Sequence, residues 1–582
     1  MIHLKAVNKY LSEYFGFDSF RPGQQQVIES ILRGDRTVAI FPTGSGKSLC
    51  YQLPALMFPG ITIVISPLIS LMKDQVDQLS KRGIPCTYIS SIVSENEVTT
   101  RIQNMKQGKY KIVYIAPERF YSQEFIDALE GLDVSFIAID EAHCISQWGH
   151  NFRPAYLKIK DLIEKTGNPM VAAFTATASR RVQQDIVRLL NLKNCKIFVG
   201  SFDRPNLEFR VERPSNKQIY VYRYIKKNIG KPGIIYAATR KHVEDLYQLL
   251  LNNGISVGMY HAGLSNEDRN LVQEAFSKGK ISVMVATNAF GMGIDKSDIR
   301  YIIHYNMPRS IEYYYQEVGR AGRDGKLASC ILLYSESDYY LNRFLIGGNY
   351  PPIKLVESIY NRVCKAGSEG IKLETLVKSH GSISKQLIHS SVRKLVEYNY
   401  VQIRRGIVYR FLPGRMLELT QEDIDKHKQV ELEKLAKIME YCNSKGCLRS
   451  YILEYFNETP SFTRCGNCSV CGSESDGTKK EAMDELLTNI LTTASPDSDS
   501  RTLNKGDEGL LKNLKGLRGK IARRTGMPEN KVFDDDMLEI IAAVKPTTRK
   551  QMLKIDGIED FNGQLYADEF LIEIHRYLRK KA

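Results

Sequence analysis

A series of short apolar runs in residues 30–340 constrains the fold more than any other feature of the sequence. The runs are nearly continuous, which is the pattern of strands buried on both faces of a parallel sheet. Amphipathic segments separate them, so the sequence predicts an α/β architecture in two units, with a break near 199–211. The runs are "TVAIF", "ITIVIS", "KIVYIA", "FIAID", "MVAAFTAT", "GIIYAATR" and "SVMVAT".

Length and charge limit the class of protein. At 582 residues the chain exceeds what one core supports, so we expect roughly three to five domains. Lys and Arg number 81 against 66 Asp and Glu, a net charge of +15 that suits either a nucleic-acid partner or simple solubility. The apolar runs are too short for a membrane span, and the N-terminus lacks a signal-peptide pattern. We therefore expect a cytoplasmic protein with no membrane contact and reduced cysteines.

The segment "PTGSGKS" (42–48) follows the strand "TVAIF" and precedes a helical pattern. Backbone N–H groups of such a loop cradle phosphates, Lys47 would reach the β- and γ-phosphates, and the Ser48 hydroxyl would bind Mg²⁺. Phe41 stands where the usual loop has its first glycine, so a chance match stays open on this motif alone. The predicted ATP-binding residues of the loop are Thr43, Gly44, Ser45, Gly46, Lys47 and Ser48.

The strand "FIAID" ends in Asp140 and Glu141. Phosphoryl transfer from ATP needs one carboxylate to hold Mg²⁺ and another to polarise the attacking water. An acidic turn after a strand is the alternative. Two such motifs, each at the carboxyl end of a strand, favour a shared ATP site.

The segment "QEVGRAGRDG" (316–325) contains Gln316, Arg320 and Arg323 between glycines. An arginine that reaches the γ-phosphate from a second domain would couple hydrolysis to closure of a cleft. A solvated basic loop is the alternative.

Together these motifs resemble the RecQ helicases of helicase superfamily two. The resemblance extends to "FGFDSFRPGQQQVI" (15–28), "SPLISLMKDQV" (66–76), "APER" (116–119), "DEAHCISQWGHNFRP" (140–154), "FTATA" (174–178) and "VATNAFGMGIDK" (285–296). It implies two RecA-like domains with ATP and Mg²⁺ in the cleft between them. It further implies 3′→5′ unwinding of duplex DNA in recombination, replication and repair.

The resemblance also assigns roles to individual residues. Gln24 would pair with the adenine edge, while Phe17 and Arg21 would sandwich the ring; Phe17 replaces the family's usual tyrosine. The residues implied to act in hydrolysis are Lys47, Asp140, Glu141, Gln316, Arg320 and Arg323.

The stretch after the acid pair resembles the aromatic-rich loop of the family. Trp148, the only tryptophan of the chain, and Phe152 would stack on unpaired bases, with Arg153 beside them. His143 would connect the acid pair to these DNA-sensing residues. A core aromatic is the alternative for Trp148. Asn151 stands where the family usually has aspartate.

Four cysteines have the spacing of a metal site. Cys447, Cys465, Cys468 and Cys471 read C-x17-C-x2-C-x2-C, which suits a tetrahedral structural Zn²⁺. Cys442 is a rival for the first ligand. Resemblance to the RecQ zinc motif favours Cys447, which begins "CLRSYILEYF".

The remaining segments predict accessory domains. In residues 352–415, "ISKQLIHSSVRKLVEYNYV" and "QIRRGIVYRF" predict a winged-helix-like module that binds duplex DNA or, alternatively, packs against protein. RecQ proteins usually carry their winged helix after the zinc site. The C-terminal helical pattern, in which Leu510, Leu514, Leu517 and Ile521 share a face, resembles the family's HRDC domain.

We thus predict ATP-binding RecA-like domain 1 at 1–200, RecA-like domain 2 at 201–345, the winged-helix-like module at 352–415, the zinc-binding domain at 420–475, a linker at 476–502 and the HRDC domain at 503–582. The expected partners are single-stranded and tailed or forked duplex DNA and a single-stranded-DNA-binding protein, with the enzyme acting as a nucleoid-associated monomer. The alternatives are a translocase or RNA helicase that does not separate DNA strands, and a nucleic-acid scaffold with an inactive ATPase.

Overall fold

The computed structural model describes residues 4–581 except 91, 147, 149–151, 292–295, 382, 405, 413, 473–507, 526–528, 534 and 553–560. The chain forms two compact units, Met1–Ser475 and Asp476–Ala582. The predicted linker at 476–502 lies outside the described residues.

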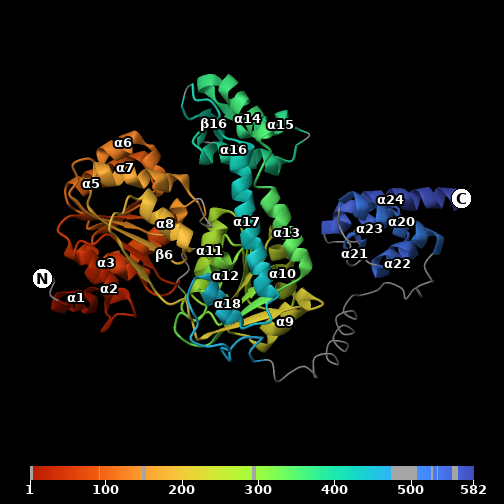
Figure 1. Ribbon diagram of the computed structural model, residues 1–582, viewed down its shortest axis with the longest axis horizontal. Helices are drawn as coiled ribbons and strands as arrows, with labels where there is room; N and C mark the ends of the chain where they lie inside the picture. Colours follow the sequence, from red (N-terminus) through yellow and green to blue (C-terminus); the bar gives the residue numbers. More distant parts are fainter. Residues whose placement is uncertain are drawn as a thin grey trace. The chain divides into compact units, whose positions relative to one another are not determined.

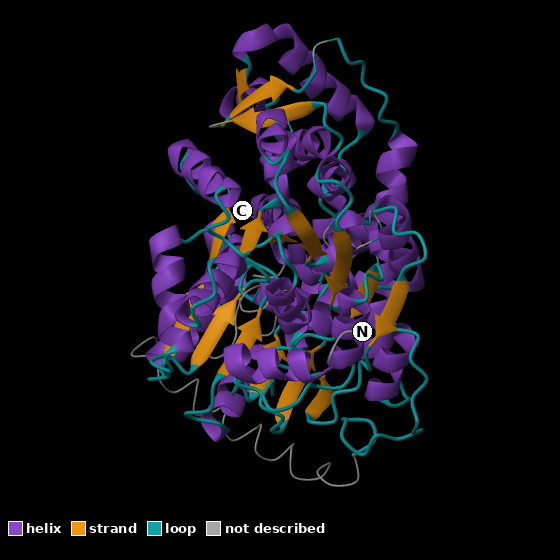
Figure 2. Ribbon diagram, turned by 90° about the vertical axis from the view of Figure 1, so that its left-hand side faces the viewer, coloured by secondary structure: helices purple, strands orange, loops and turns teal. Residues whose placement is uncertain are grey.

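Seven parallel strands make the first sheet of the larger unit, in the order β3-β4-β2-β5-β6-β1-β7 (Figure 2). They are β1 (Thr37–Ile40), β2 (Ile61–Ile65), β3 (Cys86–Ile89), β4 (Ile112–Ile115), β5 (Val134–Ile139), β6 (Met170–Thr175) and β7 (Lys196–Val199). Every residue of β1, β2 and β4 is buried, which explains their continuous apolar sequences. The acid pair follows β5 and the glycine loop follows β1, and only β6 separates these two parallel strands, so both motifs lie at the same carboxyl edge of the sheet.

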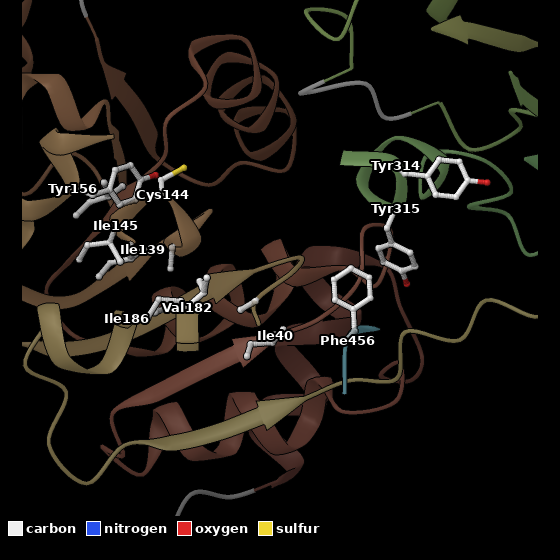
Figure 3. Packing of buried hydrophobic residues seen from close by; sticks show 14 of the residues in the cluster. Ile40, Ile139, Cys144, Ile145, Tyr156, Val182, Ile186, Tyr314, Tyr315 and Phe456 are labelled. Atoms are coloured by element: carbon white, nitrogen blue, oxygen red, sulfur yellow. The ribbon is translucent and has the colours of Figure 1, made fainter. Parts of the chain in front are cut away.

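Helices cover both faces of this sheet. Alternate residues of β1 enter opposite cores. Val38 and Ile40 pack with residues of α7 (Ile159–Lys165) and α8 (Arg180–Leu189). Ala39 packs with residues of α2 (Gln24–Leu32) and α3 (Lys47–Met57) on the other face. Figure 3 shows Ile40 and Ile139 of the sheet near Val182 and Ile186 of α8. The helices are α1 (Leu4–Tyr10), η1 (Leu11–Phe15), α2 (Gln24–Leu32), α3 (Lys47–Met57), α4 (Ile69–Lys81), α5 (Glu95–Lys106), η2 (Pro117–Tyr121), α6 (Gln123–Ala128), η3 (Ala142–Ile145), η4 (Pro154–Lys158), α7 (Ile159–Lys165) and α8 (Arg180–Leu189).

Six parallel strands make the second sheet, in the order β10-β11-β9-β12-β13-β8. They are β8 (Leu207–Glu212), β9 (Gly233–Tyr236), β10 (Val257–Tyr260), β11 (Val283–Ala286), β12 (Tyr301–His304) and β13 (Ala328–Leu333). The helices of this part are α9 (Lys217–Lys227), α10 (Arg240–Asn252), α11 (Asn266–Ser277), α12 (Ile311–Val318) and α13 (Glu336–Gly347). The prediction of two parallel-sheet domains is confirmed.

A smaller module follows α13. It has its own apolar core and a three-stranded antiparallel sheet in the order β14-β16-β15. Its elements are α14 (Ile353–Lys365), η5 (Gly367–Glu369), β14 (Ile371–Lys372), α15 (Leu373–Ser379), α16 (Lys385–Glu397), β15 (Val401–Arg404) and β16 (Ile407–Arg410). Three helices with a terminal hairpin have the element order of a winged helix. The two ends of the module lie together, because the Ile353 N–H donates to Gln421 Oε1 at 2.9 Å.

The long helix α17 (Gln421–Cys442) leaves this module, and α18 (Leu448–Tyr455) follows it. A capping box between Thr420 and Asp423 starts α17 and satisfies its first backbone N–H groups. Its 22 residues extend along α13 and α12 toward the cysteine cluster (Figure 1). A single helix therefore contacts the small module, the second sheet domain and the segment that carries the cysteines.

The C-terminal unit is helical and has a separate core. Leu510, Leu514 and Ile521 are buried and Leu517 is partly buried, so the predicted face of the first helix is the packed one. Its helices are α20 (Glu508–Thr525), α21 (Glu529–Val532), α22 (Asp535–Val544), α23 (Arg549–Met552) and α24 (Phe561–Lys581). Across the described part of the chain, we find no helix with the length and apolar character to cross a membrane.

Candidate functional site

A cavity of about 430 Å³ lies between the two parallel-sheet domains. Both domains contribute predicted residues to its lining, and the second domain contributes Gln316, Arg320 and Arg323. From the first domain come Phe17, Arg21, Gln24, Thr43, Gly44, Gly46, Lys47, Ser48, Asp140 and Glu141. Ser45 turns back on its own loop, where its Oγ donates to the Pro42 carbonyl at 2.7 Å. The structure thus gathers three motifs that are far apart in the sequence.

The glycine loop needs glycine at two positions. Gly44 and Gly46 have φ angles of 85° and 79°, the left-handed region that side chains disfavour. A Cβ atom on Gly46 would lie 2.5 Å from Gln24 Nε2. Gly46 is also the N-cap of α3, so the free N–H groups of that helix begin at the cavity. This is the geometry of a phosphate-binding helix N-terminus.

Lys47 is held inside the loop. Its Nζ donates to the carbonyls of Phe41 at 2.9 Å and Pro42 at 3.3 Å. Burial lowers the pKa of the ammonium, and the carboxylates of Glu141 and Asp140 counteract part of this shift. Neutral carbonyls are weaker acceptors than phosphate oxygens, so the ammonium has a stronger partner available in a nucleotide.

The two acids differ in their affinity for protons. Burial, followed by repulsion from Glu141, raises the pKa of Asp140 to about 7. Burial also opposes ionisation of Glu141, but the hydrogen bond and charge of His143 prevail and lower its pKa. Glu141 has a φ angle of 47°, and a non-glycine residue in this region costs about 1–3 kcal/mol, typically at functional sites.

The Mg²⁺ site fits this chemistry. Asp140 is 6% exposed, and a buried carboxylate with a raised pKa gains from a cation beside it. Ser48 lies in the first turn of α3 and lines the same cavity. Ser48 and Asp140 are therefore the residues that would hold Mg²⁺, while Glu141 remains available to orient water.

His143 connects the acid pair to the next strand. Its Nδ1 lies 3.3 Å from Glu141 Oε2 and 2.9 Å from the Oγ1 of Thr175, the last residue of β6 and part of the "FTATA" segment. Burial disfavours the imidazolium, but Cys144 and Glu141 outweigh it and raise the pKa of His143 to about 10. The imidazole thus joins the acid pair to the "FTATA" segment, while its link to Trp148, Phe152 and Arg153 stays a prediction.

The second domain presents its arginines to the loop. A Cβ atom on Gly44 would lie 3.3 Å from Arg323 Cγ, so the side chain of Arg323 lies against the glycine loop. Arg320 is 5% exposed and donates to the Gly291 carbonyl.

Arg204 is a further residue of this region, and no sequence motif predicted it. It donates to the carbonyls of Ala321 and Gly322, each at 3.0 Å, and to that of Thr43 at 3.4 Å. Arg204 therefore ties the arginine loop to the glycine loop.

The predicted adenine residues line the cavity but differ in exposure, and Gln24 is buried. Phe17 is 48% exposed, so its ring offers a free face. Gln24 uses its amide within the protein: Nε2 donates to the Ser45 carbonyl at 2.9 Å, and Oε1 accepts from the Arg21 N–H at 2.8 Å. Pairing with an adenine edge would require Gln24 to exchange these bonds.

The aromatic loop contacts helices that come later in the chain. Trp148 is half-buried, and Arg181 of α8 places its Cζ 3.1 Å from the centre of the indole ring. The His427 ring of α17 is nearly parallel, with centroids 6.3 Å apart. Arg153 pairs with Glu118 of the "APER" segment at 2.9 Å. Local sequence gave no signal for Arg181 or His427, because each approaches Trp148 only through the tertiary fold.

The four predicted cysteines form one cluster. The Sγ atoms of Cys447, Cys465, Cys468 and Cys471 lie within 4.8 Å of one another. Cys447 is part of this set and Cys442 is not, which favours Cys447 as the first ligand. Burial opposes ionisation of Cys447, but hydrogen bonds from Ser450 prevail and lower its pKa to about 6, whereas burial raises the pKa of Cys465 to about 12. The donor set fits a closed, tetrahedral Zn²⁺ site.

The zinc-binding segment packs on the connection between the two sheets. Glu458 accepts hydrogen bonds from Ser201 Oγ and the Phe202 N–H, each at 2.6 Å. Phe456 stacks on Phe202 with ring centroids 4.5 Å apart, and Figure 3 shows Phe456 beside Tyr315 of α12. Arg449 donates to Asp203 Oδ1 at 2.8 Å. The folded zinc-binding segment therefore holds residues 201–203, the connection between the two parallel-sheet domains, in place.

Comparison with protein families assigns most of these parts. Residues 21–186 match the DEAD/DEAH box helicase model and 216–325 match the helicase conserved C-terminal domain. Residues 408–472 match the RecQ zinc-binding model, and 507–574 match the HRDC domain. With the cysteine cluster, the third match confirms the expectation of Zn²⁺ as a cofactor.

Curated relatives are similar over almost the whole chain. "ATP-dependent DNA helicase RecQ" of Bacillus subtilis (strain 168) is 35% identical, over 99% of this chain and 99% of that protein. The protein of the same name from Pasteurella multocida (strain Pm70) is 34% identical, over 97% and 93%. "Probable ATP-dependent DNA helicase RecS" of Bacillus subtilis is 37% identical, over 81% of this chain and 92% of that protein. Identity at this level over the full length is what members of one family share, and the chain belongs to the RecQ helicase family.

Proposed function

We propose that the chain is an ATP-dependent DNA helicase that moves 3′→5′ along one strand and separates duplex DNA in recombination, replication and repair. The observation that carries the proposal is the shared cavity. Lys47, Asp140 and Glu141 enter it from one domain, and Gln316, Arg320 and Arg323 enter it from the other. Full-length similarity to proteins named ATP-dependent DNA helicase supports the DNA substrate.

Hydrolysis follows from the positions of these side chains. The glycine loop and Lys47 bind the phosphates, and Ser48 and Asp140 would hold Mg²⁺, which would neutralise phosphate charge. Glu141 orients the attacking water and accepts its proton. Arg323 stabilises the charge that develops on the γ-phosphate, and Gln316 and Arg320 complete the second wall. Phe17, Arg21 and Gln24 select adenine.

Movement comes from the two-domain construction of the site. Arg323 reaches the γ-phosphate from the second domain, so bound ATP favours a closed cleft and hydrolysis favours an open one. A strand held alternately by the two domains advances with each cycle. Trp148, Phe152 and Arg153 contact the unpaired strand, and His143 connects that contact to Glu141.

The remaining assignments complete the proposal. The domains run 1–200, 201–345, 352–415, 420–475 and 503–582, with a linker at 476–502. The winged-helix-like module binds duplex phosphates, and exposed Lys385 and Arg393 on α16 supply suitable charge. One chain supplies both walls of the ATP site, so the enzyme acts as a monomer. It works in the cytoplasm at the nucleoid, with a single-stranded-DNA-binding protein as partner.

A strand-separation assay tests the function. We expect ATP, but not ADP, to drive separation of a duplex with a 3′ single-stranded tail, and forked DNA to be separated as well. A duplex with only a 5′ tail and an RNA duplex serve as comparisons. DNA-stimulated ATPase without separation of tailed DNA would contradict the helicase function and indicate a translocase. Preferential separation of the RNA duplex would indicate an RNA helicase.

The sensor role of the aromatic loop gives a separate prediction. Replacing Trp148 with alanine should lower the stimulation of ATP hydrolysis by single-stranded DNA about tenfold, because base stacking on an aromatic side chain is worth about 1–3 kcal/mol. Steady-state ATPase measured against the concentration of a thymidine oligonucleotide checks it. Trp148→Phe retains a stacking face and should retain most of the stimulation. If single-stranded DNA stimulated the ATPase of Trp148→Ala as much as that of wild type, the sensor role would be wrong and Trp148 would be a packing residue only.

A further inference from the structure

Lys434 of α17 joins the aromatic loop to the helix that carries Gln316. Its Nζ donates to the Trp148 carbonyl at 2.7 Å and lies 3.7 Å from Glu312 Oε1 of α12. The side chains of Lys434 and Glu312 are only 18% and 10% exposed. These two partners belong to different parallel-sheet domains, and Lys434 belongs to neither. One ammonium therefore bridges the two domains on the side of the aromatic loop.

The α12 end of this bridge leads directly to the ATP cavity. Glu312, Gln316 and Arg320 recur every four residues, so they follow one face of α12 and its immediate continuation. Gln316 and Arg320 line the ATP cavity, and Glu312 lies one helical turn before Gln316. Any displacement of Glu312 along the helix axis is thus transmitted to Gln316, since a short helix moves as a rigid body.

The Trp148 end of the bridge responds to the strand. Arg181 lies against the indole ring, and the ring plane is nearly parallel to that of His427. A base that stacks on the indole has to compete with the guanidinium of Arg181 for the ring face. The carbonyl of the same residue is the group bonded to Lys434, so a ring displacement that shifts the Trp148 backbone also shifts this acceptor.

We propose that Lys434 is a positioning residue that transmits occupancy of the aromatic loop by single-stranded DNA to α12, and so to Gln316 and Arg320. The inference rests on the proposed sensor role of Trp148. It adds a route for the signal that runs through the zinc-side helix α17, separate from the path through His143.

Lys434→Met tests the bridge, because methionine retains most of the side-chain length and loses the ammonium. We expect maximal stimulation of ATP hydrolysis by a thymidine oligonucleotide to fall about fivefold to tenfold. The oligonucleotide concentration that gives half of the stimulation should remain within about twofold of wild type, because Lys434 acts after the strand has bound. This division between maximal rate and apparent affinity separates transmission from strand binding.

The single tryptophan gives an independent readout. Trp148 is the only tryptophan of the chain, so tryptophan fluorescence, excited at a wavelength that tyrosine does not absorb, reports on the aromatic loop alone. In Lys434→Met the oligonucleotide should still change this fluorescence, although the ATPase no longer follows. Loss of both responses together would mean that Lys434 merely keeps the loop in shape, and it would overturn the proposal.

Two further variants control for folding and charge. Lys437→Met changes a lysine on the same helix that pairs with Glu440 at 2.8 Å in an exposed position, and it should behave as wild type. The double variant Glu312→Gln with Lys434→Met removes the buried carboxylate that the single variant leaves without its ion-pair partner. It should match wild type in melting temperature, and its ATPase should still respond only weakly to the oligonucleotide. Lys434→Arg keeps the charge and should recover most of the stimulation.

The outcomes separate this proposal from the one on which it rests. If Trp148→Ala is stimulated like wild type, the sensor role fails and the bridge fails with it. If Trp148→Ala loses stimulation while Lys434→Met keeps it, only the bridge is wrong. Wild-type stimulation in the stable double variant would overturn the bridge in the same way.

Discussion

Replacing Arg323 with alanine is expected to lower kcat for ATP hydrolysis by about 10³–10⁵-fold at saturating single-stranded DNA, the range that an arginine finger contributes to phosphoryl transfer. The Arg323 side chain comes from the second domain, its Cγ lies against the glycine loop of the first, and it lines the cavity in which we propose that the γ-phosphate binds. The apparent affinity for ATP should change far less than kcat, since the phosphate-binding groups that we propose are the glycine loop and Lys47. Steady-state ATPase and binding of a fluorescent ATP analogue measure the two quantities.

Two comparisons complete this experiment. Lys326→Ala changes an exposed basic residue of the same loop and should leave the rate near that of wild type. Lys47→Ala should lose hydrolysis together with phosphate binding. A rate for Arg323→Ala within about threefold of wild type would indicate a solvated basic loop instead of a finger. Equal rates for wild type and Lys47→Ala would indicate that the ATP site is inactive.

Removing zinc is expected to have the second large effect. Structural Zn²⁺ binds its four thiolates with an apparent free energy of about 10–16 kcal/mol, so Cys468→Ser should lose the metal and unfold the segment around it. Glu458, Phe456 and Arg449 then release residues 201–203 of the interdomain connection. We therefore expect loss of DNA-stimulated ATPase as well as a lower melting temperature.

Metal content, calorimetry and ATPase rates check this prediction. Wild type should contain about one zinc ion per chain. Cys442→Ala is the matched control, because Cys442 is buried but lies outside the cysteine cluster. Retention of zinc in Cys468→Ser, or its loss in Cys442→Ala, would contradict the assignment of ligands. Full ATPase in a zinc-free protein would show that the interdomain connection needs no such support.

The sequence predicted the parts of the fold whose physical signal is local. The strands buried on both faces, such as β1 and β2, appear as continuous apolar runs. The runs that we named omitted the four edge strands, β3, β7, β8 and β10, and also two buried interior strands, β12 and β13. An edge strand has fewer buried side chains, so its composition resembles that of a loop.

The residues of the candidate site also divide into those with a local sequence signal and those without one. Lys47, Asp140 and Arg323 belong to motifs with fixed local spacing, and the structure brings all three to one cavity. Arg204 and Lys434 act through backbone carbonyls on distant segments, at Gly322 and Trp148. A carbonyl acceptor requires no particular residue type, so nothing in the sequence around it indicates the partner. Only the tertiary fold identifies such contacts.

The joined ends of the winged-helix-like module have a consequence for the architecture of the whole protein. Because the Ile353 N–H is bonded to Gln421 Oε1, the chain leaves the path from α13 to α17 and returns to it at nearly the same point. The module is in effect a domain inserted into a loop, and such an insertion perturbs little of the host domain. The position of a module along the chain therefore says little about which domains it connects structurally. A winged helix can precede the zinc ligands in the sequence while the framework from α13 through α17 to the zinc cluster stays continuous.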